Sequence, residues 1–168
     1  MAEQDKVFST LTKYSGIFSF KDFYKFCYDW LKDETGLAVF SEKKYKEQLS
    51  GDAKKIEIAW IGERELTDYF KLKIEVNFLV IGLTEIEITK DNKKIKTNKG
   101  SVEMKIAGSL VRDYKGKFEK TAFQKFLRGV YEKLVIPSRV DEFQEKVVIE
   151  CNKFLEQAKA YLDLEGKK

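Results

Sequence analysis

Five glutamates set among alternating apolar residues are the side chains best placed for acid–base chemistry. They are Glu57, Glu75, Glu85, Glu87 and Glu103. A carboxyl group acts as a general acid near neutral pH when an apolar pocket raises its pKa. Alternation puts these glutamates on the face opposite the core. The lysines that share this face predict a ladder of opposite charges across the strands: Lys71, Lys73, Lys94, Lys96 and Lys105. We therefore predict a solvated charged face here and no catalytic carboxylate pair.

The chain has no histidine and only two cysteines. Without histidine it lacks the commonest general base and the commonest zinc ligand. Cys27 and Cys151 each fall on the apolar stripe of a predicted helix, which favours free buried thiols. The glycine spacing matches neither a dinucleotide-binding motif nor a P-loop. We predict no enzymatic activity, no metal site and no cofactor.

The segment KDNKKIKTNKG, residues 90–100, is strongly basic. Its lysines are Lys90, Lys93, Lys94, Lys96 and Lys99. On a protruding hairpin they could contact nucleic-acid phosphates without sequence preference. The segment has no arginine and no aromatic residue for base stacking. We favour a soluble loop that protects a sheet edge, with weak charge-driven nucleic-acid association as an alternative.

A period of two between residues 53 and 111 predicts a sheet with one buried and one wet face. It is clearest over residues 69–81. Turn residues at Asp91-Asn92 and Asn98-Lys99-Gly100 predict short connections, and hence an antiparallel meander. With further strands at 14–20 and 37–46, we predict an α+β fold whose curved sheet has about six or seven strands.

Three amphipathic helices are predicted, over residues 21–34, 121–135 and 138–162. The second ends before Pro137 because proline disfavours helical backbone in the residue before it. The last has one continuous apolar stripe and is long enough to lie across the sheet. We predict a single domain over residues 1–168, with residues 1–12 as a flexible end.

Aromatic residues make up 14% of the chain. On the first predicted helix, Phe20, Tyr24 and Tyr28 widen the apolar surface beyond what one sheet contact needs. Such a surface is either buried between two layers or contacts a partner. Our leading hypothesis is a non-enzymatic binding or protein-interaction module, with a protein partner or self-association.

The element order, strand–helix–meander–long helix, resembles the helix-grip fold of START and Bet v 1-type proteins. This chain differs by having one helix after the first strand and an extra helix before the last. The resemblance implies an alternative function, a carrier that holds an apolar small molecule beneath the last helix. The residues that would line such a site are Trp60, Phe78, Met104, Phe154 and Tyr161.

Two segments, FKDFYKFCYDWL and FQKFLRGVYEKLVIPSR, are similar to small uncharacterised archaeal proteins. That similarity implies no activity. The polar start MAEQDK does not resemble a signal peptide. The longest uncharged apolar run, residues 78–83, is far shorter than the roughly 20 residues of a membrane span. We expect a cytoplasmic protein that does not span a membrane.

Overall fold

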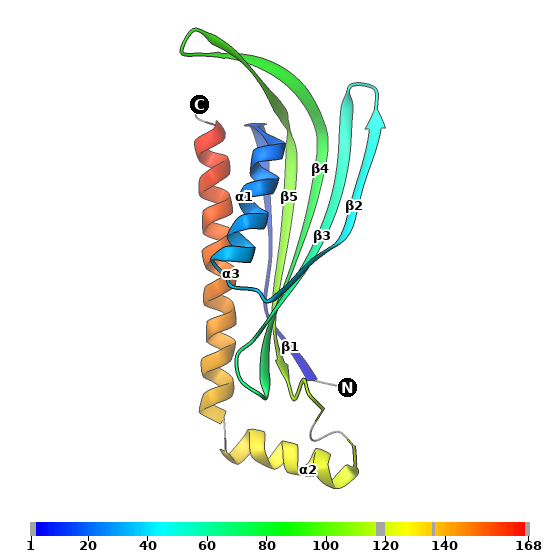
Figure 1. Ribbon diagram of the computed structural model, residues 1–168, viewed down its shortest axis with the longest axis vertical. Helices are drawn as coiled ribbons and strands as arrows, with labels where there is room; N and C mark the ends of the chain where they lie inside the picture. The colour runs from blue at the N-terminus through cyan, green and yellow to red at the C-terminus, as the bar shows by residue number, and fades with distance from the viewer. Residues whose placement is uncertain (1–2, 117–119, 136, 167–168) are drawn as a thin grey trace.

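The computed structural model describes residues 3–116, 120–135 and 137–166. It is an α+β fold with one antiparallel sheet, as predicted (Figure 1). The strands are β1 (Glu3–Phe18), β2 (Val39–Ser50), β3 (Ala53–Glu65), β4 (Phe70–Lys90) and β5 (Lys93–Arg112). The helices are α1 (Phe20–Asp33), α2 (Ala122–Val130) and α3 (Pro137–Gly166), and a π-helical turn, η1 (Tyr131–Val135), follows α2.

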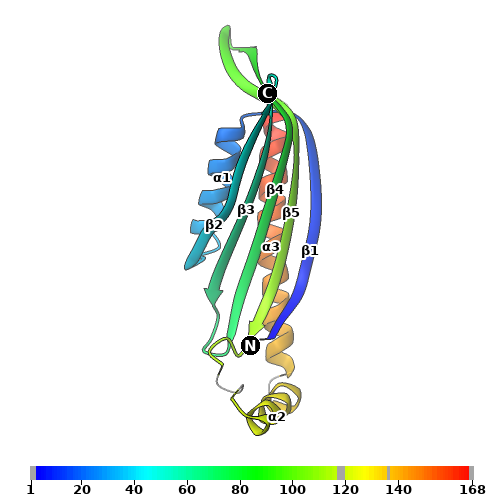
Figure 2. The same ribbon diagram turned by 90° about the vertical axis from the view of Figure 1, so that its right-hand side faces the viewer.

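The sheet runs in the order β1-β5-β4-β3-β2, and every neighbouring pair is antiparallel. Strands β2 to β5 form the predicted meander. The first strand returns to the edge beside β5, where Phe18 pairs with Asn98 and Glu3 with Arg112. Two layers result, because α1 and α3 both lie on the same face of this sheet (Figure 2).

The predicted number of strands was wrong: among the described residues there are five. Residues 69–81 and 84–90 belong to one strand, β4. Gly82 has φ +66°, and the pairing register with β5 shifts between Ile81 and Thr84, so the strand bends without ending. Residues 98–100 form no turn. Asn98 pairs with both Phe18 and Glu85, which keeps β5 continuous.

The first strand was also predicted too short. It begins at Glu3 and not near Tyr14, so residues 3–12, which we expected to form a flexible end, lie in β1 and pair with β5. A register shift between Lys6 and Phe8 marks a bulge at Val7. Here β1 has mixed polarity and is half exposed, which hides the period of two in the sequence.

The core lies between the sheet and the two long helices. From the sheet it takes the alternate side chains of β3, β4 and β5, and from the helices the stripes that begin at Phe23 and Val140. Phe18, Leu72, Ile106 and Phe154 are each 0% exposed. The prediction that the last helix is long and packs on the sheet is confirmed, since α3 contacts β1, β4 and β5.

At its far end the β4–β5 hairpin leaves the sheet. Residues 86–97 pair only with each other, since β1 ends opposite Asn98 and β3 begins opposite Leu83. Asp91 and Asn92 both have positive φ, 52° and 63°, which gives the tight turn predicted from their sequence. The result is a two-stranded arm that curves beyond the other strands (Figure 1).

Helix α3 can approach β5 because residue 108 is glycine. A Cβ atom built on Gly108 would lie 2.5 Å from Sγ of Cys151 and 2.8 Å from Cγ1 of Val147. Both side chains are 0% exposed and have little room to shift. Glycine at this position therefore sets the spacing between sheet and helix.

We predict that Gly108→Ala lowers the free energy of unfolding by about 1–3 kcal/mol, because it overpacks this contact. Urea denaturation measures the change. Gly129→Ala is the matched control: nothing lies within 4 Å of a Cβ there. The control should be neutral or stabilise by up to about 1 kcal/mol, since alanine favours the helix. The double variant Gly108→Ala/Cys151→Ala should lose less than the sum of the two single variants. Strict additivity would contradict the proposed contact.

Both cysteines are free and buried, as the sequence indicated. Burial raises the pKa of the Cys27 thiol well above its usual value, and burial together with the charge of Glu150 raises that of Cys151 to about 12. The thiolate form is therefore favoured by unfolding. Each thiol contributes stability that is fully present below the unfolded pKa, about 8.5, and is lost progressively as the pH rises from there toward the raised folded pKa.

We predict that the free energy of unfolding falls between pH 8 and 10 with a slope that depends on these thiols. Denaturation at several pH values should show a shallower fall in the variant Cys27→Ala/Cys151→Ala. In the native protein a thiol reagent should react no faster than the chain unfolds. Rapid labelling of the native protein would show that the thiols are accessible.

Candidate functional site

Helix α2 lies at one end of the elongated molecule, crosswise to α3, with the β4–β5 turn at the opposite end (Figure 1). Thr121 caps it, because its side chain accepts a hydrogen bond from the backbone N–H of Gln124 at 3.1 Å. No residue of α2 is buried. Its nearest packed neighbour is η1, and it makes few contacts with the sheet or with α3.

The polar side of this helix faces the body of the protein. Arg128 donates a hydrogen bond to Glu3 at 2.9 Å and lies 3.8 Å from the carboxylate of Asp113. Its side chain is only 12% exposed, and that of Asp113 is 1% exposed. The charged face is thus the anchored face.

Arg112, at the end of β5, joins three elements. It donates hydrogen bonds to Asp5 of β1 and, at 2.8 Å, to Glu132 of η1, whose other oxygen accepts from the Tyr69 hydroxyl. Burial alone would lower the pKa of Arg112, but the hydrogen bond to Asp5 and the charge of Glu132 outweigh it and raise the pKa. Burial and Glu132 also raise the pKa of Tyr69, so the phenol stays a donor.

The apolar side of α2 and η1 faces outward. Phe123 is 67% exposed, Phe126 64% and Leu134 77%. Leu127 and the half-buried Val130 complete the stripe. We call these five residues the outward face. Beside it is a shallow hollow of about 330 Å³, lined by Lys125, Phe126, Gly129, Val130, Lys133 and Leu134.

This arrangement reverses the usual orientation of an amphipathic helix, which buries its apolar stripe. Single exposed hydrophobic residues are ordinary on protein surfaces, but a contiguous group bordered by polar residues marks an interaction site. The outward face is such a group. It is the candidate functional site.

The residues predicted to line a carrier site lie together in the core. Trp60, Phe78, Met104 and Phe154 are at most 5% exposed, and the Tyr161 ring stacks on Phe26. Aromatic rings pack between α1 and the sheet, and a gap among the described residues there has no room for a water molecule. That gap is lined by Phe20, Phe23, Tyr24, Ile58, Phe78, Val80 and Val102. The residues predicted for a carrier site therefore belong to, or pack against, the described core.

The predicted interaction face of α1 turns toward the sheet. Tyr24 and Tyr28 pack edge-on against Trp60, and Phe20 packs against Tyr24. Glu42 of β2 accepts hydrogen bonds from the Tyr24 hydroxyl and from Trp60 Nε1, the latter at 2.9 Å. Burial, reinforced by Glu42, raises the pKa of Tyr24. These half-buried rings join α1 to β2 and β3.

The predicted basic patch lies on the hairpin arm. Lys93, Lys94, Lys96 and Lys99 are exposed, and Lys90 is half buried. A shallow hollow of about 210 Å³ separates this arm from the start of α1 and contains Asp22, Lys90 and Lys96. These lysines are far from α2 (Figure 1).

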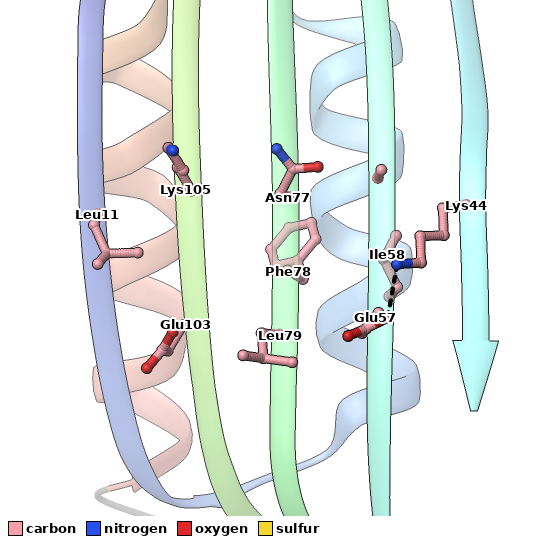
Figure 3. Close-up of a pocket in the computed structure, with 10 residues that line it drawn as sticks. Leu11, Lys44, Glu57, Ile58, Asn77, Phe78, Leu79, Glu103 and Lys105 are labelled. Atoms are coloured by element: carbon pink, nitrogen blue, oxygen red, sulfur yellow. Dashed lines mark ion pairs between the residues drawn. The ribbon is translucent and has the colours of Figure 1, made fainter. Parts of the chain in front are cut away.

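A second hollow, of about 280 Å³, lies on the sheet face away from the helices (Figure 3). Leu11, Asn77 and Leu79 contribute to it beside charged side chains. Glu57 there is paired with Lys44 at 2.7 Å, and that hydrogen bond lowers its pKa. A carboxyl group with a lowered pKa is a poor general acid, so Glu57 is a poor candidate for that role.

No family model, curated protein or solved structure matches this chain. The resemblances to helix-grip proteins and to archaeal proteins therefore stay predictions. In the described part of the chain, no group of three histidine, cysteine, aspartate or glutamate side chains is arranged to hold a metal ion. None of the described helices combines the length and apolar content that crossing a bilayer requires.

Sequence reasoning recognised the stripe of the outward face but not its direction. A period of 3.6 identifies an apolar side without saying what that side contacts. The feature that indicates the direction is the charged side of the helix, where Arg128 and Glu132, four residues apart, both pair with the body of the protein. Their partners, Glu3 and Arg112, are distant in sequence, so no local pattern shows the anchor.

We predict that Arg112→Met lowers the free energy of unfolding by about 2–3 kcal/mol, less than for a fully buried pair because these side chains are partly exposed. It should also speed amide hydrogen exchange in residues 122–135. Lys115→Met is the control, because it removes the exposed Lys115–Asp68 pair at the same end. The control should cost under about 1 kcal/mol. Equal effects of the two variants would contradict an anchoring role for Arg112.

Proposed function

We propose that this protein is a non-enzymatic binding module that docks through the outward face of α2 and η1. The observation that carries this proposal is the reversed orientation of the helix: Arg128 and Glu132 are paired with the body, and the phenylalanines and leucines point away from it. Core formation does not explain this stripe. A partner that covers it does.

The size of the stripe supports this function. Full burial of a phenylalanine or leucine side chain is worth about 1.5–3 kcal/mol. Scaled by the exposed fractions of Phe123, Phe126, Leu127 and Leu134, covering them yields roughly 5 kcal/mol in total. Part of this gain is offset by the entropy lost on association. The remainder suits a reversible contact.

The anchor also favours binding. Because Arg112, Glu132 and Arg128 hold the helix against the ends of β1 and β5, the outward face is ordered before a partner arrives. A preorganised surface avoids the cost of ordering a loop on binding. The exposed residues Leu11, Ile81 and Ile149 lie on three different elements, β1, β4 and α3.

Photocrosslinking tests this proposal directly. With benzoylphenylalanine in place of Phe126, we expect adducts with protein or lipid when the purified protein is mixed with an extract of its own cells. Excess wild-type protein should suppress these adducts, whereas excess Phe126→Glu variant should not.

The same photoreactive residue at Ile149 is the matched control. Ile149 is 45% exposed on α3 but lies outside the outward face. The proposal fails if positions 126 and 149 give the same adducts, or if the Phe126→Glu variant competes as well as the wild type. Circular dichroism of each variant checks that the fold is retained.

A further inference from the structure

We propose that the outward face docks on the surface of an anionic phospholipid bilayer, with α2 lying flat in the interfacial region. This inference rests on the proposed function and names its partner. Three observations carry it: the charge that borders the stripe, the shape of the apolar surface, and the position of the helix in the molecule.

The charge bordering the stripe is positive. Lys120, Lys125 and Lys133 are exposed around it. The single acidic residue within 120–135, Glu132, is turned inward and paired with Arg112. Apolar residues bordered by lysines are typical of helices that bind anionic membrane surfaces. An anionic leaflet attracts each nearby lysine, and the apolar side chains enter its acyl boundary.

The shape of the surface favours a bilayer over a peptide. A peptide helix binds in a groove with walls from two or more elements. The outward face instead belongs to one helix and its π-helical turn, whose opposite side is anchored to the sheet through Arg112 and Glu3, while η1 also contacts α3. The hollow beside it is lined wholly by residues of α2 and η1. A bilayer can cover the outward face and both of its exposed flanks at once, whereas a folded partner would cover one flank.

A second copy of the chain is a poorer occupant. An antiparallel pair of α2 helices related by a twofold axis would place each lysine-bearing flank against its own copy. Lys125 and Lys133 would then meet lysines, and the exposed side of 120–135 has no carboxylate to pair with them. Like charges at close range oppose this contact, but they favour an anionic surface.

The position of the helix allows flat contact. It lies across one end of the elongated molecule, with no other labelled element beyond it in either view (Figures 1 and 2). The lysine-rich turn of the β4–β5 hairpin is at the opposite end (Figure 1). Phe123, Phe126 and Leu134 can therefore enter a membrane surface while the hairpin stays away from it.

Flotation with lipid vesicles tests the inference. We expect the full chain to bind vesicles of equal parts phosphatidylglycerol and phosphatidylcholine more tightly than vesicles of phosphatidylcholine alone. The gain is roughly fivefold for each lysine near the leaflet, and so on the order of a hundredfold for three at low salt. Added salt should reduce the preference, because the screening length falls below about 10 Å above 0.1 M.

Two sets of variants separate the contributions. Lys120→Gln/Lys125→Gln/Lys133→Gln should lose the preference for anionic vesicles. Lys93→Gln/Lys94→Gln/Lys96→Gln removes the same charge from the hairpin and should keep that preference. Phe126→Ser/Leu134→Ser should lose binding to both vesicle types. All these positions are exposed, so thermal unfolding should change little.

The outcomes distinguish the inference from the proposed function. If the wild type ignores anionic vesicles while benzoylphenylalanine at position 126 captures a protein that wild type displaces, the bilayer is the wrong partner and the docking face stands. If light scattering shows a dimer that Phe126→Ser dissolves, the partner is a second copy. If the hairpin variant alone loses vesicle binding, α2 is not the membrane contact. Failure of both vesicle binding and crosslinking removes both proposals.

Discussion

The pairing of half-buried charges at one end of the sheet decides which way α2 faces. Arg112 must satisfy its guanidinium group where β1, β5 and η1 meet, and Asp5 and Glu132 are the acids within reach. Arg128 has the same need beside Asp113, which is 1% exposed. Leaving such a charge unpaired costs several kcal/mol. The helix therefore turns its charged side inward, and its apolar stripe is left outside.

Two contributions to the free energy oppose each other in the orientation of α2: burial of its apolar stripe and pairing of its charged side chains. Turning the helix over would bury Phe123, Phe126 and Leu134 and gain roughly 5 kcal/mol. It would also separate Glu132 from Arg112, and Arg128 from Glu3 and Asp113, at about 2–3 kcal/mol for each partly buried pair. The charges win. In an isolated chain the stripe gains nothing from its exposure, so its composition is better explained by a contact outside the chain.

Much of the fold could be predicted from the sequence because its strands and helices follow the periods of two and 3.6 residues in their apolar side chains. The alternation through Leu72 and Ile74 correctly predicted a sheet with one buried and one solvated face. The apolar stripe that begins at Val140 correctly predicted the long helix that covers it. The errors came from pairing between distant residues. Gly82 and Asn98 resemble turn residues, yet β5 and β1 keep both in strands. The orientation of α2 was not predicted because its charged residues pair outside the helix: Arg128 with Glu3, 125 residues away, and Glu132 with Arg112, 20 residues away.

The core between the sheet and the long helices is packed, whereas helix α2 is exposed. In a grip-type arrangement the space between sheet and helices could hold a ligand, but here Phe23, Trp60 and Phe78 occupy it with edge-to-face contacts. Such packing stiffens the body, and a stiff body keeps the two ends of the molecule apart. With α2 at one end and the lysine-rich hairpin at the other, a contact made by the helix leaves the hairpin free. Because the helix contributes no buried side chain to the core, its outward face can be covered and uncovered without disturbing the fold.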